Sequence, residues 1–349
     1  MKCTKIGKSI KSNKNQTMKK TCLMMLIPLI MGACTKEVEQ EEAAVIRPSS
    51  KGSQASTLAG TDDFYGVMFS SNENVANATP KLNDLGVRWC RVWVNISDWD
   101  TPSNNTGTGY QQAIDLHNAG FKVILHFNSL NGVVPNYTKA KAVFQWAVTK
   151  PNLKDAVDIW EIFNELNNTE YFNQAHSTTL TLTQQAKNYI FGALKAGWDV
   201  FHVTHAEKVL GGSWTLWQQG SNYSTSSSYN LNLTQAYLNN GYLTYCDYAG
   251  IHPYHESATS QRTFLTDFKS RIGGKPIIIS EWGLKPGGYT ATTYTTAMDS
   301  NLSFMKQNVV TACYYRFTPG NGWFGLVSGT GYSTQVEPAY TTYKNWPKL

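Results

Sequence analysis

The segment Trp160-Glu-Ile-Phe-Asn-Glu-Leu-Asn167 is a short apolar run that ends in an amide and a carboxylate. A second segment of this kind is Lys275-Pro-Ile-Ile-Ile-Ser-Glu-Trp-Gly283, whose apolar run leads to a glutamate at position 281. Short apolar runs bounded by polar or turn-forming residues are typical of buried strands. A charge beside such strands is costly unless it is compensated. We therefore expect two buried strands whose ends carry the chemistry of the protein.

Outward from these two segments, the chain alternates short apolar runs with longer amphipathic ones. The strand candidates are Tyr65–Phe69, Trp89–Val94, Lys122–Phe127, Trp160–Phe163, Val209–Gly212, Tyr248–His252, Pro276–Ser280 and Cys313–Phe317. Helical segments are expected near 74–85, 109–119, 138–148, 181–204, 233–240, 260–272 and 291–307. Eight strands alternating with helices over roughly 285 residues predict an α/β fold of the (β/α)8 TIM-barrel type. An open doubly wound sheet is the alternative, but no Gly-rich phosphate loop follows the first strand.

The N-terminus has the features of an export signal. Lys19 and Lys20 precede the apolar stretch 23–31, which is too short to span a membrane, and small residues then lead to Cys34. This pattern predicts a signal peptide over residues 1–33, and it begins in more typical form at Met18 than at Met1. The cysteine after the small residues resembles the lipobox of bacterial lipoproteins, which implies lipidation of Cys34. An ordinary signal peptide with an incidental cysteine is the alternative.

Residues 34–60 are polar, small and poor in aromatic side chains, so we expect a flexible tether before a single catalytic domain over residues 61–349. The acidic stretch after Cys34 resembles the outer-surface export tags of some Gram-negative lipoproteins. We therefore expect an exported lipoprotein at the outer membrane or cell surface, with contact to the membrane only through its lipid anchor.

Composition excludes several classes of protein. Seven of the 30 basic residues, but none of the 24 acidic ones, lie in residues 1–33, so the remainder has a net charge of −1 and not the +6 of the whole chain. A nucleic-acid binder keeps its basic excess in the folded part. With 41% apolar residues the chain is not disordered. Its 11 Trp and 19 Tyr residues suit a cleft that stacks on a flat, polar ligand.

The cysteines of the folded part indicate neither disulfides nor a metal. Cys90, Cys246 and Cys313 are odd in number and widely spaced, and none belongs to a CxxC pair. The spacing of His and Cys residues suits no structural zinc site. We expect these thiols to be small buried hydrophobes, and we expect no metal and no cofactor.

In a TIM barrel, residues just past the carboxyl end of a strand face the site. Glu165 follows the fourth predicted strand, and Glu281 follows the seventh. Each glutamate alone could instead cap a helix that starts after its strand. Two glutamates at the ends of the most apolar strands favour a shared catalytic site.

Asn164-Glu165 after strand 4, with Glu281-Trp-Gly283 after strand 7, resembles the retaining glycoside hydrolases of the (β/α)8 superfamily called clan A. The run Trp160–Asn167 is most similar to the "W-x-x-x-N-E-P-N" form of families 5 and 39, with Leu166 in place of the proline of many members. The resemblance covers nearly all of residues 62–349. It implies that Glu165 is the acid/base and Glu281 the nucleophile.

Four further positions agree with this resemblance. Arg91 lies in the middle of the second strand, where a charge needs a carboxylate partner, and the resemblance implies that it holds the nucleophile ionised. An exposed position with a packed stem is the alternative for Arg91. His252 and Tyr254 end strand 6 and are expected to contact the nucleophile or the sugar. The amide of Asn164 is expected to bind the sugar 2-hydroxyl.

Additional residues are candidates for binding sugar. His126 and Asn128, at the end of strand 3, are expected to bind hydroxyl groups, although a buried and satisfied histidine is an equal alternative for His126. Trp282 and Trp323 are expected to stack on sugar rings, and Trp214 is a weaker candidate. Aromatic residues also pack barrels, which is the alternative for all three.

These residues predict hydrolysis of β-linked glycosidic bonds by double displacement, with carboxyl groups about 5–5.5 Å apart rather than the about 6.5–9.5 Å of inverting enzymes. A polysaccharide or oligosaccharide substrate, endo action and a monomeric state are expected. Two alternatives belong to other classes: a surface barrel that captures glycans without cutting them, and a metal-dependent barrel hydrolase. The second needs His and Asp ligands at several strand ends, and only His126 and His252 stand at such positions.

Overall fold

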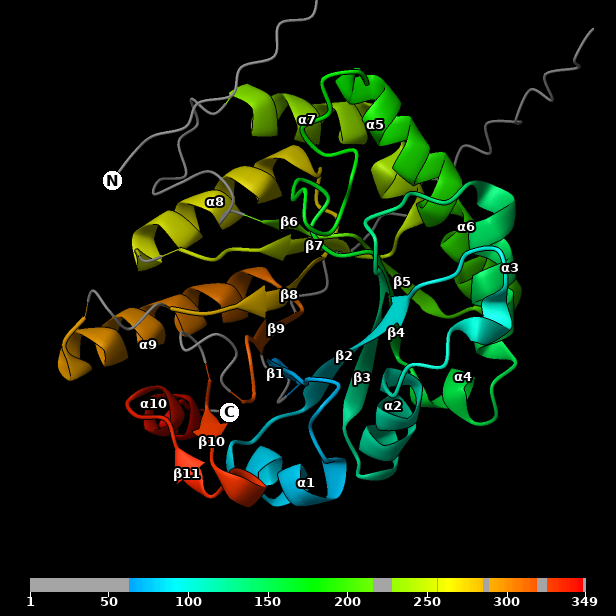
Figure 1. Ribbon diagram of the computed structural model, residues 1–349. Helices are drawn as coiled ribbons and strands as arrows, with labels where there is room; N and C mark the ends of the chain where they lie inside the picture. The colour runs from blue at the N-terminus through cyan, green and yellow to red at the C-terminus, as the bar shows by residue number, and fades with distance from the viewer. Residues whose placement is uncertain (1–62, 216–227, 256, 285–288, 319–324, 348–349) are drawn as a thin grey trace, which may run out of the picture. The chain divides into compact units, whose positions relative to one another are not determined.

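The apolar runs of the sequence form parallel strands, and the amphipathic segments form helices around them (Figure 1). The computed structural model describes residues 63–215, 228–255, 257–284, 289–318 and 325–347. The predicted signal peptide and tether, including Cys34, lie outside the described residues, and so does Trp323.

One parallel sheet of 9 strands curls around a central axis in the order β5-β4-β3-β2-β1-β9-β8-β7-β6. Its strands are β1 Tyr65–Met68, β2 Trp89–Ile96, β3 Lys122–Ser129, β4 Ile159–Ile162, β5 Lys208–Gly211, β6 Trp214–Thr215, β7 Ala249–His252, β8 Ile277–Trp282 and β9 Thr311–Tyr314. Leu210 of β5 bridges in parallel to Tyr248, just before β7, so the curled sheet closes. The predicted TIM barrel is confirmed.

The fifth barrel strand is broken into two pieces, which explains why eight predicted strands correspond to nine. β5 pairs with β4 and β6 pairs with β7, and Gly212 lies between the two pieces. Its N–H donates to Tyr189 Oη at 2.7 Å, and Tyr242 Oη donates to its carbonyl at 3.0 Å. A Cβ on Gly212 would lie 2.8 Å from the carbonyl oxygen of Ile162. Close approach of backbone therefore requires glycine at this bend.

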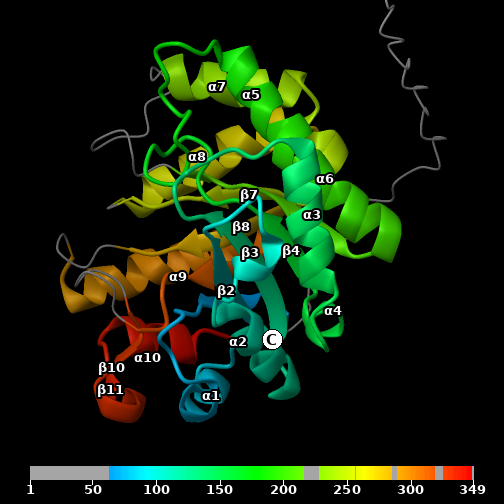
Figure 2. The same ribbon diagram turned by 45° about the vertical axis from the view of Figure 1, so that its right-hand side comes forward.

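Helices cover the outside of the barrel (Figure 2). They are α1 Val75–Asp84, α2 Gly109–Asn118, α3 Tyr137–Val148, α4 Leu153–Ala156, α5 Leu182–Tyr189, α6 Lys195–Gly197, α7 Ser228–Asn239, α8 Ala258–Arg271, α9 Ala291–Asn308 and α10 Ala339–Asn345. π-helical turns at Ile190–Leu194 and Trp198–Thr204 continue α5 and α6 into one helical stretch, as predicted for 181–204. Side chains cap the N-termini of several helices at Asn74, Asn136, Thr181, Ser257 and Thr290.

Two short helices and a hairpin were not predicted. Helix α4 has 4 residues and α10 has 7, which is too short for a helical period to be recognised. A hairpin of β10 Val327–Ser328 and β11 Thr334–Gln335 follows the last predicted strand, Cys313–Phe317. Among the described residues, no helix has the length and apolar character needed to cross a membrane.

The barrel interior begins with an apolar layer and continues with a polar one. The apolar layer consists of Trp89, Ile124, Ile159, Leu210, Ile278 and Cys313, which form a cluster separate from the core between strands and helices. Side chains two positions apart face the same side of a strand. The residues two positions after four of these members are Arg91, His126, Glu161 and Ser280, and all four are buried. The polar layer therefore lies toward the carboxyl ends of the strands.

Cys90, Cys246 and Cys313 are free, buried thiols, as predicted. Burial raises the pKa of Cys246 to about 12, so the thiol stays protonated at neutral pH. These side chains pack as small hydrophobes.

Candidate active site

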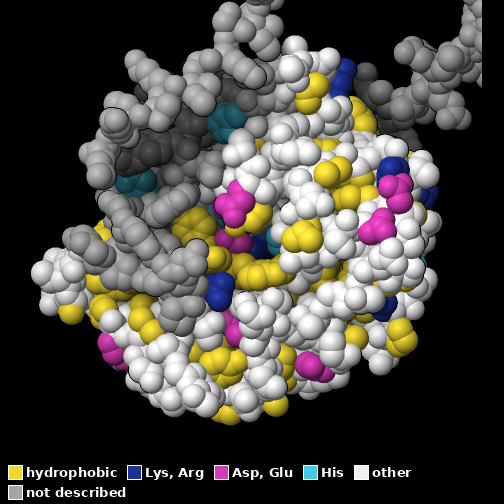
Figure 3. Space-filling view, in the orientation of Figure 1, with side chains coloured by type: hydrophobic (Ala, Val, Ile, Leu, Met, Phe, Trp, Pro, Cys, Tyr) yellow, Lys and Arg dark blue, Asp and Glu magenta, His cyan; other side chains and the backbone are white. Residues whose placement is uncertain are grey.

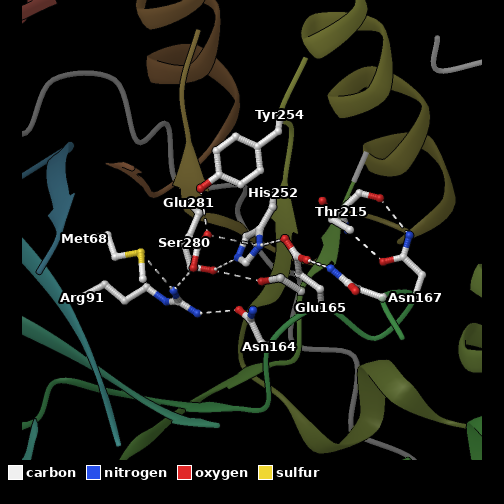
Figure 4. A network of polar contacts seen from close by, with 12 residues as sticks. Met68, Arg91, Asn164, Glu165, Asn167, Thr215, His252, Tyr254, Ser280 and Glu281 are labelled. Atoms are coloured by element: carbon white, nitrogen blue, oxygen red, sulfur yellow. Dashed lines mark hydrogen bonds and ion pairs between the residues drawn. The ribbon is translucent and has the colours of Figure 1, made fainter. Parts of the chain in front are cut away.

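Glu165 and Glu281 meet at the carboxyl end of the barrel, although 116 positions of sequence separate them (Figure 4). One carboxylate oxygen of each lies within 4.8 Å of the other and of a ring nitrogen of His252. Both glutamates are buried, with 6% and 5% of their surface exposed. The face that carries them is hollowed near its centre, where acidic, basic and histidine side chains lie among apolar ones (Figure 3).

A left-handed residue turns the chain at the end of β4. Phe163 has a φ of 68°, which is uncommon for a bulky residue and is found mostly where function requires it. After this turn Asn164 contacts Arg91, and Glu165 contacts His252. Two consecutive side chains therefore point toward the barrel axis, which a regular strand does not allow.

A β-bulge has the same effect on β8. The register of β8 against β9 shifts between Ile279 and Trp282. Ser280 and Glu281 consequently both face the barrel interior, where they contact His252 and Arg91 respectively. Trp282 faces the opposite side and packs edge-on against Tyr314.

The prediction that Trp282 and Trp214 stack on sugar rings is therefore wrong. Trp282 is 0% exposed because the bulge turns its ring into the core between strands and helices. Trp214 is 2% exposed and packs edge-on against Tyr237 in the same core. Neither ring is accessible to a sugar. Trp323, the third candidate, lies outside the described residues.

Arg91 connects Glu281 to a further buried carboxylate, Glu161. Its Nε donates to Glu161 at 2.5 Å, its Nη1 donates to Glu281, and its Nη2 donates to Asn164 Oδ1 at 3.1 Å. Burial alone lowers the pKa of Arg91, but the charges of Glu161 and Glu281 raise it above its ordinary value. The guanidinium thus stays charged and stabilises two anions, so the exposed alternative for Arg91 is excluded.

The second oxygen of Glu281 accepts a hydrogen bond from Tyr254, with Oη 2.8 Å from Oε2. Burial first, and then the charge of Glu281, raise the pKa of the Tyr254 phenol well above its ordinary value. The phenol therefore remains a donor at any physiological pH. Glu281 accepts two strong hydrogen bonds that stabilise its negative charge.

Glu165 has different partners. Asn168 Nδ2 donates to Oε2 at 2.6 Å, and His252 Nδ1 lies 2.9 Å from Oε1. The same ring nitrogen lies 3.8 Å from Glu281 Oε2, which is beyond hydrogen-bond distance. Within the described residues, no arginine or lysine forms an ion pair with Glu165. The two glutamates thus occupy different electrostatic environments.

Glu161 is a third central carboxylate that sequence reasoning missed. It is 0% exposed, and its Oε1 accepts hydrogen bonds from Ser280 at 2.8 Å and from Ser213 at 3.2 Å. The signal was present in the sequence, because Glu161 occupies the interior face of β4 two residues after Ile159. A charge within a run of four buried residues requires a buried partner.

His126 and Asn128 lie on β3, at the same mouth. His126 is buried, and neither of its ring nitrogens has a hydrogen-bond partner in the described structure. Burial first, and then the nearby charge of Arg91, lower the pKa of His126 well below its ordinary value. The neutral imidazole can therefore both donate to and accept from a ligand. Asn128 donates to Asn95 Oδ1 at 2.9 Å, and its own Oδ1 has no partner in the described structure.

Three half-buried aromatic residues near the mouth were not predicted. Tyr171 and Tyr315 face both glutamates: burial first, and then the charges of Glu165 and Glu281, raise the pKa of each phenol. Trp93 lies two residues beyond Arg91 on β2, on the interior side of the strand. Their sequence positions resemble ordinary barrel packing, so only their exposure distinguishes them from Trp282.

A metal site must also be considered. Within the described part of the chain, Glu165, His252 and Glu281 have ligand atoms close enough together to hold a metal ion. His252 already contacts Glu165, and Glu281 already accepts hydrogen bonds from Arg91 and Tyr254. The guanidinium of Arg91 at Glu281 repels a cation. This donor set therefore fits a network of ion pairs and hydrogen bonds better than a metal site.

Neither a protein-family model nor a curated protein matches this sequence. Its fold is similar to that of solved glycosidases. A glucosidase from Croceicoccus marinus is 12% identical with a TM-score of 0.54, and the match covers 73% of this chain and 60% of that one. A family 39 glycoside hydrolase from Bacteroides cellulosilyticus WH2 is 14% identical with a TM-score of 0.56, covering 82% and 64%.

A family 1 β-glucosidase from Thermotoga maritima is 12% identical with a TM-score of 0.57, and the match covers 82% of this chain and 97% of that one. The chain spans less than two thirds of the length of the first two proteins, with 60% and 64% covered. At these identities the similarity concerns the fold. The chain has the TIM-barrel fold of these glycoside hydrolases, so the resemblance expected from its motifs is confirmed at that level.

Proposed function

We propose that the protein is a retaining glycoside hydrolase that cleaves β-linked bonds of a polysaccharide by double displacement. One observation carries this proposal: Glu165 and Glu281 converge over one barrel mouth, with oxygens within 4.8 Å, in different environments. A glycosidic bond breaks through an oxocarbenium-like transition state. Its formation needs a carboxylic acid on one side of the bond and a carboxylate on the other.

Glu281 is the nucleophile. Arg91 and Tyr254 both donate to it, so its negative charge is stabilised and its oxygen is held in place. In the first step this oxygen attacks the anomeric carbon while the bond to the leaving oxygen breaks. A covalent glycosyl-enzyme results, and the charge of Glu281 is neutralised.

Glu165 is the acid and then the base. It gives its proton to the leaving oxygen as the bond to the anomeric carbon breaks. In the second step it takes a proton from the water that attacks the same carbon, and Glu281 is released as a carboxylate. Both carboxylates act at one carbon from opposite sides of the ring, so the β configuration is kept.

Neighbouring groups suit the sugar whose anomeric carbon is attacked, that is, the sugar in the −1 subsite. Because Arg91 donates to Oδ1 of Asn164, the NH2 group of that amide is directed elsewhere, and we assign it to the sugar 2-hydroxyl. His126 carries two unpartnered nitrogens, and we assign it to a further hydroxyl. The half-buried rings of Trp93, Tyr171 and Tyr315 supply apolar faces for neighbouring sugars. Several such rings favour a polymer and endo action.

A panel of β-glucans, β-mannans and xylans tests the proposal, with reducing ends and product lengths as the readout. Glu281→Gln is expected to abolish cleavage and to leave binding of the cleaved polymer intact. Glu170→Gln, at an exposed glutamate, is the matched control and is expected to retain cleavage. If the wild type binds glycans and cleaves none, the protein is a glycan-capture barrel and the proposal fails.

The stereochemistry is measured separately by proton NMR of the first products. The β anomer is expected to form before mutarotation equilibrates the two anomers. An initial α anomer would mean an inverting enzyme and would contradict the role given to Glu281.

We also propose that the protein is exported and anchored by a lipid at Cys34, on the basis of the sequence alone. A surface anchor suits an enzyme whose substrate is a polymer too large to import. Mass spectrometry of the mature N-terminus checks the lipid, and unmodified Cys34 would contradict it.

A further inference from the structure

A continuous chain of hydrogen bonds connects Glu165 to the buried Glu161. His252 Nδ1 lies 2.9 Å from Glu165 Oε1, and His252 Nε2 lies 2.9 Å from Ser280 Oγ. Ser280 Oγ lies 2.8 Å from Glu161 Oε1. His252, Ser280 and Glu161 are each 0% exposed. Figure 4 shows His252 between Glu165 on one side and Ser280 on the other.

The hydrogen atoms of this chain can be assigned from its ionised end. Arg91 Nε donates to Glu161 at 2.5 Å, so Glu161 is a carboxylate and can only accept. Two oxygens 2.8 Å apart need a hydrogen between them, and only Ser280 can supply it. Because the hydroxyl hydrogen of Ser280 is used, its oxygen must accept at His252 Nε2. Nε2 of the imidazole therefore carries a hydrogen and donates it to Ser280.

The hydrogen between Nδ1, on the other side of the ring, and Glu165 follows from the proposed role of Glu165. In the proposed function Glu165 is the acid, so its carboxyl group carries a proton in the resting enzyme. Among the described residues, Glu281 Oε2 lies 3.8 Å from Nδ1, the Tyr254 ring packs edge-on against the imidazole, and His126 is a further titratable neighbour. Nδ1 is then an acceptor, and its 2.9 Å contact requires a hydrogen on Glu165 Oε1. Asn168 donates to the other oxygen, which leaves Oε1 for that hydrogen.

We propose that Glu161 and Ser280 are positioning residues that hold His252 in the Nε2–H tautomer, so that Nδ1 accepts a hydrogen bond from the protonated carboxyl group of Glu165. This inference rests on the proposed function, in which Glu165 is the acid. In the first step the proton moves from Glu165 Oε1 to the leaving oxygen, and in the second a proton of the attacking water returns to Oε1. His252 keeps its proton on Nε2 throughout and exchanges none.

The tautomer has a consequence for both steps. After the proton leaves, Oε1 faces the lone pair of Nδ1, which cannot donate to it. The carboxylate form of Glu165 therefore lacks one hydrogen bond that the opposite tautomer would offer, and this makes it a stronger base toward water. Glu161 thus acts on the acid/base from the far side of two intervening side chains.

Nitrogen-15 NMR of the imidazole rings tests the assignment without any substrate. The wild type at neutral pH is expected to show His252 with a protonated Nε2 and an unprotonated Nδ1, assigned by the loss of its signals in His252→Asn. A protonated Nδ1 with an unprotonated Nε2 would overturn the proposal. If Ser280→Ala fails to fold, the wild-type spectrum alone still decides.

The pH dependence of kcat/KM provides the second readout, on the polymer that the wild type cleaves. Ser280→Ala removes the acceptor at Nε2, so the alkaline limb is expected to move down by about one pH unit, with about a tenfold loss beyond it. Ser213→Ala is the matched control, because Ser213 contacts Glu161 and Ser280 but not His252. Its alkaline limb and tautomer are expected to match the wild type. Equal limbs in Ser280→Ala and the wild type would contradict the role of Ser280.

The two proposals fail in different ways. Absence of glycan cleavage by the wild type contradicts the proposed function. The opposite tautomer in an active enzyme contradicts only the role of Glu161 and Ser280.

Discussion

Glu73 lies between β1 and α1 and is a buried carboxyl group outside the catalytic network. Its oxygens accept from Ser70 N at 2.6 Å and from the N–H of Thr318 at 3.1 Å, and also from the Thr318 hydroxyl. Burial raises the pKa of Glu73 from its ordinary 4.5 to about 7, against these hydrogen bonds and the charge of Arg316. The folded protein therefore binds the proton of Glu73 more tightly than the unfolded chain does.

The sign of the effect on stability follows from linkage. The contribution of Glu73 is fully present below the ordinary pKa of 4.5 and is lost as the pH rises through about 7. Each pKa unit corresponds to about 1.4 kcal/mol, so the whole loss is about 3 kcal/mol. Between about pH 5 and about pH 8 the expected loss in the free energy of unfolding is about 2.5 kcal/mol.

Glu73→Gln isolates this contribution, because glutamine keeps the shape of the side chain and does not ionise. Urea unfolding measures the free energy of unfolding of both proteins at about pH 5 and about pH 8. The value of the variant minus that of the wild type is expected to rise by about 2.5 kcal/mol from the lower pH to the higher. Glu170→Gln, at an exposed glutamate, is the control and should track the wild type. An equal difference in stability between Glu73→Gln and the wild type at both pH values would mean that Glu73 does not titrate between them.

Two further predictions concern the barrel itself. Arg91→Met leaves Glu161 and Glu281 without their shared cation. Thermal and urea unfolding at neutral pH should therefore show a free energy of unfolding lower by about 3–5 kcal/mol. Arg88→Met, at an exposed arginine, is the control and should change it little. Gly109→Ala places a Cβ 2.0 Å from the carbonyl oxygen of Trp93 and should cost about 1–3 kcal/mol or more, while Gly107→Ala, with its nearest atom at 3.9 Å, should be close to neutral in the same assay.

Much of the fold could be predicted because its signals are local. Strand and helix candidates follow from runs of apolar residues and from their periods, which each segment carries independently of the rest. Segments without a period escaped, such as the seven-residue α10. The break between β5 and β6 also escaped, because it depends on hydroxyl groups of Tyr189 and Tyr242 that approach from other elements.

The site was predicted in its outline and not in its details. Glu165, Glu281 and Arg91 could be found because a charge at the end or in the middle of an apolar strand is locally conspicuous. Trp282 was misassigned because the bulge on β8 reverses which side its ring faces. Glu161 has the same local signal as Arg91, and its partner lies on a strand 70 positions away.

The alternation of strands with helices, and the carboxylates and arginine at strand ends and interiors, are written in the amino-acid sequence. Which of these groups touch depends on the folded barrel, as do the inward orientation of both Ser280 and Glu281 and the place of His252 between Glu165 and Ser280. The difference lies in the range of the forces. Periodicity and burial cost are properties of a segment, whereas hydrogen bonds are directional and depend on how strands from distant parts of the chain are packed.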